Sequence, residues 1–453
     1  AWRISEENFF KNSSVSSWFS NLKLRASYGM MGDDNLGGLY PDFAYLSGYT
    51  YYKGQSLMPD DPFSSVKSKK VIGSVPKGIP VTTISWMKIK LMNVGIDFGF
   101  FDNRLTGEFD LFKRMRDGIP GTPSDIMFPL ETGLSALPEN MNSDMTVGFD
   151  AFVKWNDKVG DLKYSVGANI TFARQKNGKR HGEIFGNAWD KYRWAQSNRW
   201  SNVVLNTDQG NAGGVWMWEV IGRFETQEQI DSYPVDQDGQ NNATVRPGDV
   251  ILRDVNGDGI INDFDERPQA YASADWPWDS STSNKNPLIS MGINLGFEWK
   301  GVDVAADFAG GFKNTFVADW DLKWGVTRSV NGYYYNNIDV WRHEDIFDPK
   351  SPWIPGKFPA LRGQESHSGR WWNSFYTREV NYLRLRNLVV GYSLPKNWIR
   401  KVGMEQCRIY FQGTNLFCLS SLHDYGFDPE ISTVNGQDYP QHKVLTLGVN
   451  VKF

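Results

Sequence analysis

The chain has 453 residues, including 19 Trp, 19 Tyr, 28 Phe, 44 Gly and 21 Pro. Its 48 Lys and Arg nearly balance 52 Asp and Glu, and the formal net charge of −4 excludes the clustered positive charge that nucleic-acid binding requires. Charged residues at 22% and apolar residues at 40% are ordinary for a folded chain, which excludes wholesale disorder. Length alone predicts two or three domains of about 150 residues, unless one large all-β unit takes up the whole chain.

Membrane-spanning helices are not predicted. Such a helix needs roughly 20 apolar residues in a row, whereas runs such as Leu388 to Tyr392 end after a few positions. The chain opens with Ala1-Trp2-Arg3-Ile4 and carries neither an initiator Met nor a signal sequence there. We therefore expect a processed or truncated chain.

Apolar and polar residues alternate over segments of about 10 to 13 positions, which predicts strands with one apolar and one polar face. The first strand is expected at Leu22 to Tyr28. A hairpin of Val94 to Phe100 and Leu105 to Leu111 follows, with a two-residue turn at Asp102-Asn103, because both residues tolerate positive φ.

Seven further strands are expected, which brings the total to ten. The segment that starts at Val380 changes its apolar phase near Asn387, which predicts a β-bulge. The seven strands comprise two hairpins, Met145 to Trp155 with Leu162 to Phe172 (joined by 156–161) and Ile289 to Trp299 with Val302 to Phe308 (turn at Lys300-Gly301), and three single strands, Val380 to Leu394, Cys407 to Phe417 and Lys443 to Phe453.

The links between these strands alternate between short and long. An antiparallel sheet with this alternation has one smooth rim and one rim of large loops, which is typical of outer-membrane barrels with tight periplasmic turns and long extracellular loops. Trp155 and Trp299 precede short turns, where an interfacial aromatic girdle is expected. The alternative is a soluble sandwich with the aromatic residues in its core. The short links are 102–103, 156–161, 300–301 and 395–406, and the long ones are 32–85, 115–142, 176–285, 314–376 and 418–442.

Ten strands could close a narrow barrel, but the five long loops are more than the rim of such a barrel ordinarily carries. We therefore expect residues 1–453 to be the C-terminal arc of a larger barrel, with 176–285 as its largest outer loop. The strand edge near Leu22 would then be prone to aggregation if the arc stood alone.

Residues 254–265, within the largest loop, match the spacing of a twelve-residue calcium loop. Alternate oxygens at its first positions would face one centre, Gly259 would make the sharp turn, and Ile260 would offer its carbonyl. The strand-like stretch before it argues against a helix-flanked EF-hand. The alternative is an Asx- and Gly-rich surface turn without an ion. The predicted ligands of Ca²⁺, which would make the loop rigid and carry no catalysis, are Asp254, Asn256, Asp258, Ile260, Asn262 and Asp265.

A catalytic constellation is not evident. The five histidines are scattered, and no nucleophile motif such as G-x-S-x-G surrounds a serine, so we expect no enzymatic activity. The loops are rich in Trp, whose flat faces suit sugar or peptide ligands and equally suit packing between loops. No single Trp is assigned to a ligand.

Several segments resemble the SusC/RagA-like TonB-dependent outer-membrane transporters of the Bacteroidetes type, and the resemblance runs along the whole chain and matches the C-terminal half of that family. The segments that carry it are Trp18 to Gly29, Asn93 to Gly99, Asn103 to Asp110, Gly248 to Val250 before the Asp254 loop, Asn381 to Leu388 and Leu447 to Phe453.

The resemblance implies a 22-stranded barrel in the outer membrane, with a plug and a TonB-interacting box in an N-terminal part that this sequence lacks. It also implies a SusD-like lipoprotein lid and TonB-dependent import of oligosaccharides or peptides. Two alternatives remain: a self-contained ten-stranded barrel enzyme, such as a protease working from its outer loops, and a soluble carbohydrate-binding β-sandwich.

Overall fold

The computed structural model describes residues 1–34, 45–53, 72–76, 79–121, 123, 129, 136–177, 188–189, 191–192, 215–270, 287–317, 339–360, 373–423, 426–430, 439 and 441–453. Within these residues, no helix is both long enough and apolar enough to cross a membrane.

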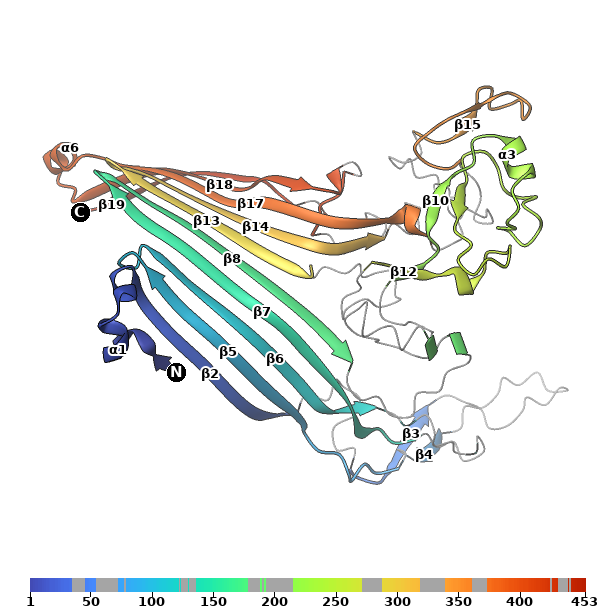
Figure 1. The fold of residues 1–453 in the computed structure, drawn as a ribbon, viewed down its shortest axis with the longest axis horizontal. Coiled ribbons are helices and arrows are strands. Elements are labelled where there is room, and N and C mark those ends of the chain that lie inside the picture. Colours follow the sequence, from blue (N-terminus) through green and yellow to red (C-terminus); the bar gives the residue numbers. More distant parts are fainter. Residues whose placement is uncertain are drawn as a thin grey trace.

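One large antiparallel sheet dominates the described part of the chain (Figure 1). Its strands follow chain order, and several neighbouring pairs keep an unbroken register along their length. The all-β antiparallel prediction is confirmed. In sheet order the eleven strands are β1 (Trp2–Arg3), β2 (Phe19–Asp33), β5 (Met87–Phe100), β6 (Leu105–Gly121), β7 (Glu139–Val159), β8 (Leu162–Asn177), β13 (Ile289–Trp299), β14 (Val302–Val317), β17 (Thr377–Ser393), β18 (Gln406–Ser420) and β19 (Val444–Lys452).

All ten predicted strands are present, and most extend beyond their predicted ends on the loop side. β7, for example, begins at Glu139 and β6 continues to Gly121. The prediction stopped early because these extensions lose the strict alternation of apolar and polar residues. The eleventh strand, β1, is a two-residue addition that covers a small part of the β2 edge at Leu24 and Lys23.

The short turns lie where the sequence placed them, with two corrections. The Lys300-Gly301 turn has positive φ at both residues, as a tight hairpin requires. The turn between β5 and β6 was predicted as two residues but includes Phe101 and Arg104, with φ positive at Phe101, Asp102 and Asn103. The link predicted at 156–161 is shorter, because β7 continues to Val159 and leaves a two-residue turn before β8.

The predicted β-bulge in β17 is confirmed. The register against both neighbouring strands shifts between Leu385 and Asn387, and against β14 Arg386 is the extra residue, whereas against β18 the pairing skips Asn415 and Leu416 as well. A bulge places two successive side chains on the same face. Arg386 and Asn387 therefore share the polar face, while Leu385 and Leu388 share the apolar one.

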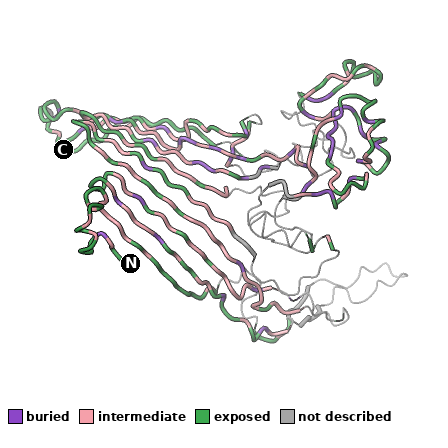
Figure 2. Tube along the Cα trace, viewed as in Figure 1, coloured by how far each residue is buried: buried purple, intermediate pink, exposed green. Residues whose placement is uncertain are grey.

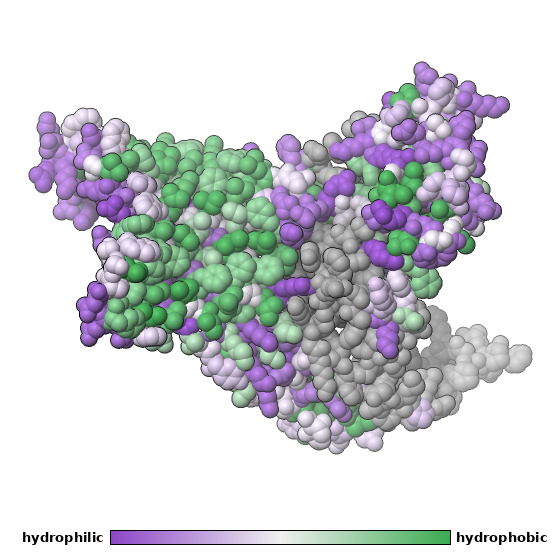
Figure 3. All heavy atoms as spheres, viewed as in Figure 1, coloured by the Kyte–Doolittle hydropathy of each residue, from purple (hydrophilic) through white to green (hydrophobic). Residues whose placement is uncertain are grey.

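The sheet has an apolar outer face and a polar inner face. Outer residues such as Val94, Leu111 and Leu447 are exposed by 60%, 52% and 78%. Together they form a continuous apolar surface between two polar ends (Figure 3). The 11 residues of β13 span about 36 Å along the strand, or about 28 Å along a barrel axis at a tilt of about 40°, which matches the hydrocarbon core of a membrane.

Burial is concentrated outside the sheet, in a small folded unit of residues 215–270 that we call the loop module (Figure 2). One core groups Phe224 with Ile230, and a second groups Leu252 with Ile261. The module is built from β9 (Val215–Met217), β10 (Val220–Arg223), α3 (Gln227–Asp231), β11 (Val250–Leu252), η4 (Asp263–Asp265) and β12 (Arg267–Ala270).

The remaining described elements lie around the two ends of the sheet (Figure 1). They are η1 (Ile4–Glu6), α1 (Asn8–Lys11), η2 (Ser14–Ser17), β3 (Tyr49–Lys53), β4 (Ile72–Pro76), β15 (Arg342–His343), β16 (Trp353–Ile354), η6 (Ser374–Tyr376), α6 (Lys396–Ile399) and η7 (Arg400–Val402).

Candidate functional site

The inner face of the sheet carries charges of both signs that pair across strands. Arg25 on β2 contacts Asp97 at 2.6 Å and Asp110 at 2.8 Å, and Lys23 contacts Asp97 at 3.0 Å. Glycine opposite these side chains keeps the face open, since a Cβ at Gly95 would lie 2.2 Å from Asp110 Oδ1. The inner face is therefore polar and carries charges of both signs. Other pairs on it are Lys90 with Asp117, Arg116 with Asp144, and Arg408 with Asp303.

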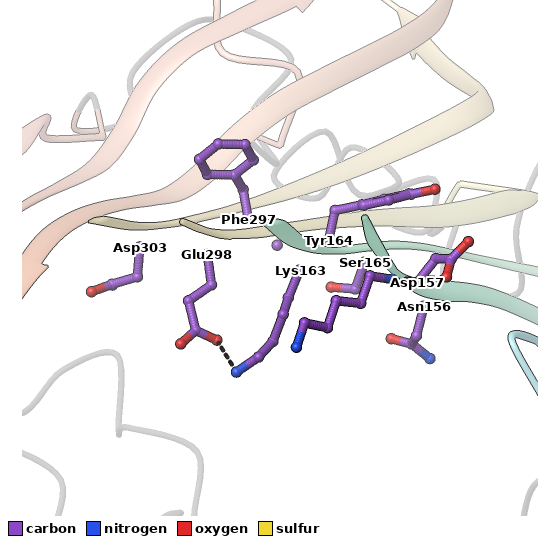
Figure 4. A pocket seen from close by; sticks show the side chains of 10 residues that line it. Asn156, Asp157, Lys163, Tyr164, Ser165, Phe297, Glu298 and Asp303 are labelled. Atoms are coloured by element: carbon purple, nitrogen blue, oxygen red, sulfur yellow. Dashed lines mark hydrogen bonds and ion pairs between the residues drawn. The ribbon is translucent and has the colours of Figure 1, made fainter. Parts of the chain in front are cut away.

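A shallow hollow of about 600 Å³ lies on the inner face near the short turns (Figure 4). Ser165 and Gly296 line it beside the ion pair of Lys163 and Glu298, whose Nζ and Oε2 atoms are 3.1 Å apart. Phe297 points away from Glu298, as alternation along β13 requires (Figure 4). The mixed charges and the small residues Ser165 and Gly296 of the hollow suit a polar chain.

Near the loop end, a buried ion-pair network holds residues 426–430 against the inner face. The Arg384 side chain is only 4% exposed and pairs with Asp428 and with Glu430 Oε2, the latter at 3.1 Å. The Tyr382 hydroxyl donates to Glu430 Oε1 at 3.0 Å, and Arg386 also pairs with Glu430. Tyr382, Arg384 and Arg386 reach these carboxylates together, because side chains two positions apart share one face of a strand. We call this network the wall latch.

The calcium-like loop brings three of its predicted carboxylates together. One oxygen each of Asp254, Asp258 and Asp265 lies within 4.8 Å of the other two. Asp265 is fully buried. Like charges at this separation repel, so the cluster suits a bound cation.

Backbone N–H groups hold these carboxylates in place. Asp254 accepts from Gly257 at 2.6 Å and from Gly259 at 2.9 Å, where φ is positive at both glycines. Asp265 accepts from Val255 and Asn262. A hydrogen bond from the Ile260 N–H is the main cause that lowers the pKa of Asp258.

The remaining predicted ligands, Asn256, Ile260 and Asn262, lie around the carboxylate cluster. Asn256 and Asn262 each donate a side-chain N–H to Asp258, at 2.9 and 3.4 Å, so their amides bridge the loop. The Ile260 side chain is half exposed. The loop lies between β11 and β12 with only the one-turn η4 inside it, which agrees with the expectation that no EF-hand helices flank it.

The loop module is joined to the sheet close to this loop. The Trp218 indole N–H donates to the Asn262 carbonyl at 2.7 Å, and the Ser374 N–H donates to the Trp218 carbonyl at 2.9 Å. The Val220 N–H donates to Ser374 Oγ. Since η6 leads directly into β17, the position of the calcium-like loop is coupled to the end of a wall strand.

The sequence did not predict the wall latch or the two module cores. The alternating residues Tyr382, Arg384 and Arg386 could have pointed to the latch, because residues two apart share one face of a strand. The cores carry no strand-length alternation, so periodicity could not find them. Among the loop tryptophans, Trp189, Trp216 and Trp218 fall within the described residues, and Trp194, Trp200, Trp276, Trp278, Trp320, Trp324, Trp371 and Trp372 lie outside them.

The sequence of the chain is similar to those of known proteins. No protein-family model matches the chain. Over its full length the chain is 23% identical to the TonB-dependent receptor SusC of Bacteroides thetaiotaomicron, of which it covers 39%. It is 23% identical to TonB-dependent receptor P39 of Formosa agariphila, of which it covers 42%. The chain thus spans about two-fifths of the length of these relatives. Both relatives are named as receptors.

Solved structures agree on the fold. The whole chain superposes on 42% of a chain of the RagAB peptide importer in its open-open state, with a TM-score of 0.64 and 19% identity. The closed-closed state gives a TM-score of 0.62 and 21% identity. The sheet is therefore an arc of a transmembrane β-barrel. The resemblance to the SusC/RagA-like TonB-dependent receptors is confirmed, and the chain is an outer-membrane protein with the fold of the part of that barrel that it matches.

Proposed function

We propose that the chain forms part of the wall of a TonB-dependent outer-membrane transporter that imports oligosaccharides or peptides. The observation that carries the proposal is the sidedness of the sheet. Its apolar outer face suits lipid, and its inner face carries ion pairs such as Arg25 with Asp97 that suit a polar cargo. The relatives named TonB-dependent receptors and the RagAB peptide importer support this reading.

The proposal includes a SusD-like surface lipoprotein as a lid and the TonB complex as the energy source. The described loops gather at one end of the sheet, opposite the short turns, where a lid would sit (Figure 1). Their ordered tips expose Ile346 and Phe347 by 71% and 89%. We infer that these two adjacent exposed apolar side chains would contact the lid.

Uptake by cells that carry the gene tests the import role. Two probes are used, a fluorescent oligosaccharide mixture and a fluorescent peptide mixture. An in-frame deletion of this gene should reduce the uptake of one probe. The remaining uptake should equal that of wild-type cells treated with an uncoupler of the proton gradient. Uptake of both probes that is unchanged by the deletion would show that the chain is not an importer of either class.

We also propose that the 254–265 loop binds Ca²⁺ and stiffens the loop module. The clustered carboxylates of Asp254, Asp258 and Asp265 support it, as does the twelve-residue spacing. Asp265 is shorter than the usual Glu at the last position, so its capture of the ion depends on the buried backbone contacts that orient it.

Calorimetric titration of the detergent-solubilised protein with calcium tests this binding. Asp254→Ala should abolish the heat of binding, because it removes a carboxylate from the centre of the cluster. Asp263→Ala is the matched control, since Asp263 is an exposed acid in the same loop outside the ligand positions. Absence of heat in the wild-type protein would remove the calcium proposal.

A further inference from the structure

We propose that the short-turn end of the sheet carries a binding site for the headgroup of an anionic phospholipid in the periplasmic leaflet. The site is formed by two neighbouring turns, the β13–β14 turn and the α6–η7 segment. We call it the basic corner, and its residues are Trp299, Lys300, Lys396, Trp398, Arg400 and Lys401.

The two turns are joined through the backbone. The Ser393 N–H donates to the Gly301 carbonyl at 2.7 Å, and Val302 pairs with Tyr392. Gly301 allows the close approach, since φ there is +88° and a Cβ would lie 2.8 Å from the Ser393 carbonyl oxygen. Trp299 and the start of α6 are thereby held beside one another at one rim.

The position of the corner matches the membrane interface. Tyr392, the last outer-face residue of β17, is 39% exposed, and α6 begins shortly after it at Lys396. Ile399 is buried and anchors the segment, whereas Trp398 is 65% exposed. An exposed Trp just beyond an apolar band is typical of a side chain that lies among lipid headgroups.

The corner is strongly positive. No Asp or Glu occurs between Glu379 and Glu405, and Glu405 itself pairs with Lys452 at 3.1 Å. Lys300, Lys396, Arg400 and Lys401 are exposed, and within the described residues none has a carboxylate partner. Lys300 Nζ lies 5.4 Å from the centre of the Trp299 ring.

The neighbouring turns differ in charge. On the β7–β8 side, Lys163 is paired with Glu298, and Arg104 lies 3.5 Å from Asp157. These two cations of the β7–β8 side are therefore balanced by carboxylates, whereas the four cations of the corner are not. Cations beside exposed aromatic side chains at an interface attract anionic headgroups, by about 1 kcal/mol for each cation near the surface.

Native mass spectrometry of the whole chain in neutral detergent tests the site. Dioleoyl phosphatidylglycerol and dioleoyl phosphatidylcholine are titrated separately. The wild-type chain should retain phosphatidylglycerol in preference to phosphatidylcholine. The triple variant Lys396→Gln, Arg400→Gln, Lys401→Gln should retain phosphatidylglycerol at least about tenfold less well, given about 1 kcal/mol per cation and tenfold per about 1.4 kcal/mol.

A matched control removes the same charge from the inner face of the same end, with Lys154→Gln, Lys158→Gln and Lys163→Gln. This variant should retain phosphatidylglycerol like the wild type. Equal loss in both triple variants, or equal retention of the two lipids by the wild type, would overturn the site.

Two further variants keep the test decisive if the triple variant folds poorly. Lys396→Arg with Lys401→Arg preserves the charge and should retain the lipid. Trp398→Phe should reduce the quenching of protein fluorescence by brominated phosphatidylglycerol in vesicles. Unchanged quenching would show that Trp398 lies outside the headgroup layer and would contradict the proposal.

Discussion

Asp238 in the loop module is surrounded by donors. Its carboxylate accepts hydrogen bonds from the N–H groups of Gln240 and Asn242 and from both the N–H and the hydroxyl of Thr244, all at 2.7 to 2.9 Å. Partial burial opposes its ionisation, but these hydrogen bonds outweigh burial and lower the pKa of Asp238 to about 2. The ionised carboxylate therefore closes the 238–244 turn.

This lowered pKa predicts a pH dependence of module stability. Asp238 contributes fully above its unfolded pKa of 3.8, and the contribution is lost as the pH falls towards 2. Its size is roughly 1–2 kcal/mol after allowance for partial exposure. Asp238→Asn should lower the protection of the 238–244 amides from hydrogen exchange at pH 6. In this variant the protection should then change little between pH 4 and pH 2, whereas in the wild type it should fall. Equal acid sensitivity in both proteins would disprove this role.

The wall latch depends on Arg384, which is almost fully buried between two carboxylates. Arg384→Gln leaves Asp428 and Glu430 without this cation, and breaking a buried pair in this way costs about 3–5 kcal/mol. We expect faster hydrogen exchange at 426–430. Arg386→Gln is the comparison, because the Arg386 side chain is 39% exposed and such a pair contributes about 1 kcal/mol or less. Equal effects of the two variants would contradict the latch.

Among the elements, the bulge in β17 shows how a local sequence signal acquires a role only in the folded sheet. Alternation on both sides of Asn387 is clear in the sequence and predicts the bulge. The contact of the extra residue, Arg386, is with Glu430, which lies 44 positions away and meets it only after the sheet has formed. The sequence therefore predicted the element and not its contact.

The loop module is predicted to unfold independently of the sheet. Phe224 is fully buried in a module core, and Phe224→Ala should cost about 3–5 kcal/mol. We expect proteolytic cleavage within 215–270 while the sheet keeps its resistance to detergent. Ile221→Ala is the control in the strand β10 that directly precedes Phe224, because Ile221 is 51% exposed. Loss of the sheet in Phe224→Ala would show that the two parts fold as one unit.

For the whole molecule, the sidedness of the sheet makes a paired prediction on β8. Ile170 is exposed on the outer face, and its neighbour Asn169 is exposed on the inner face. Ile170→Arg should destabilise the protein in phospholipid vesicles by about 2–4 kcal/mol, because it places a charge in the hydrocarbon region. Asn169→Arg should change stability little. The free energy of unfolding in denaturant measures both, and a larger loss for Asn169→Arg would reverse the assignment of the faces.

The sequence by itself determined the strands, their two faces and the order of short and long links, because alternation and turn chemistry are local properties of the chain. It also placed the calcium-like loop, whose predicted ligands lie within twelve positions. Only the tertiary structure decided which distant residues meet: the latch between β17 and 426–430, the paired cores of the loop module, and the basic corner formed by the turns at Gly301 and Lys396. These contacts depend on register between strands that are far apart in the chain, and periodicity within one strand carries no information about them.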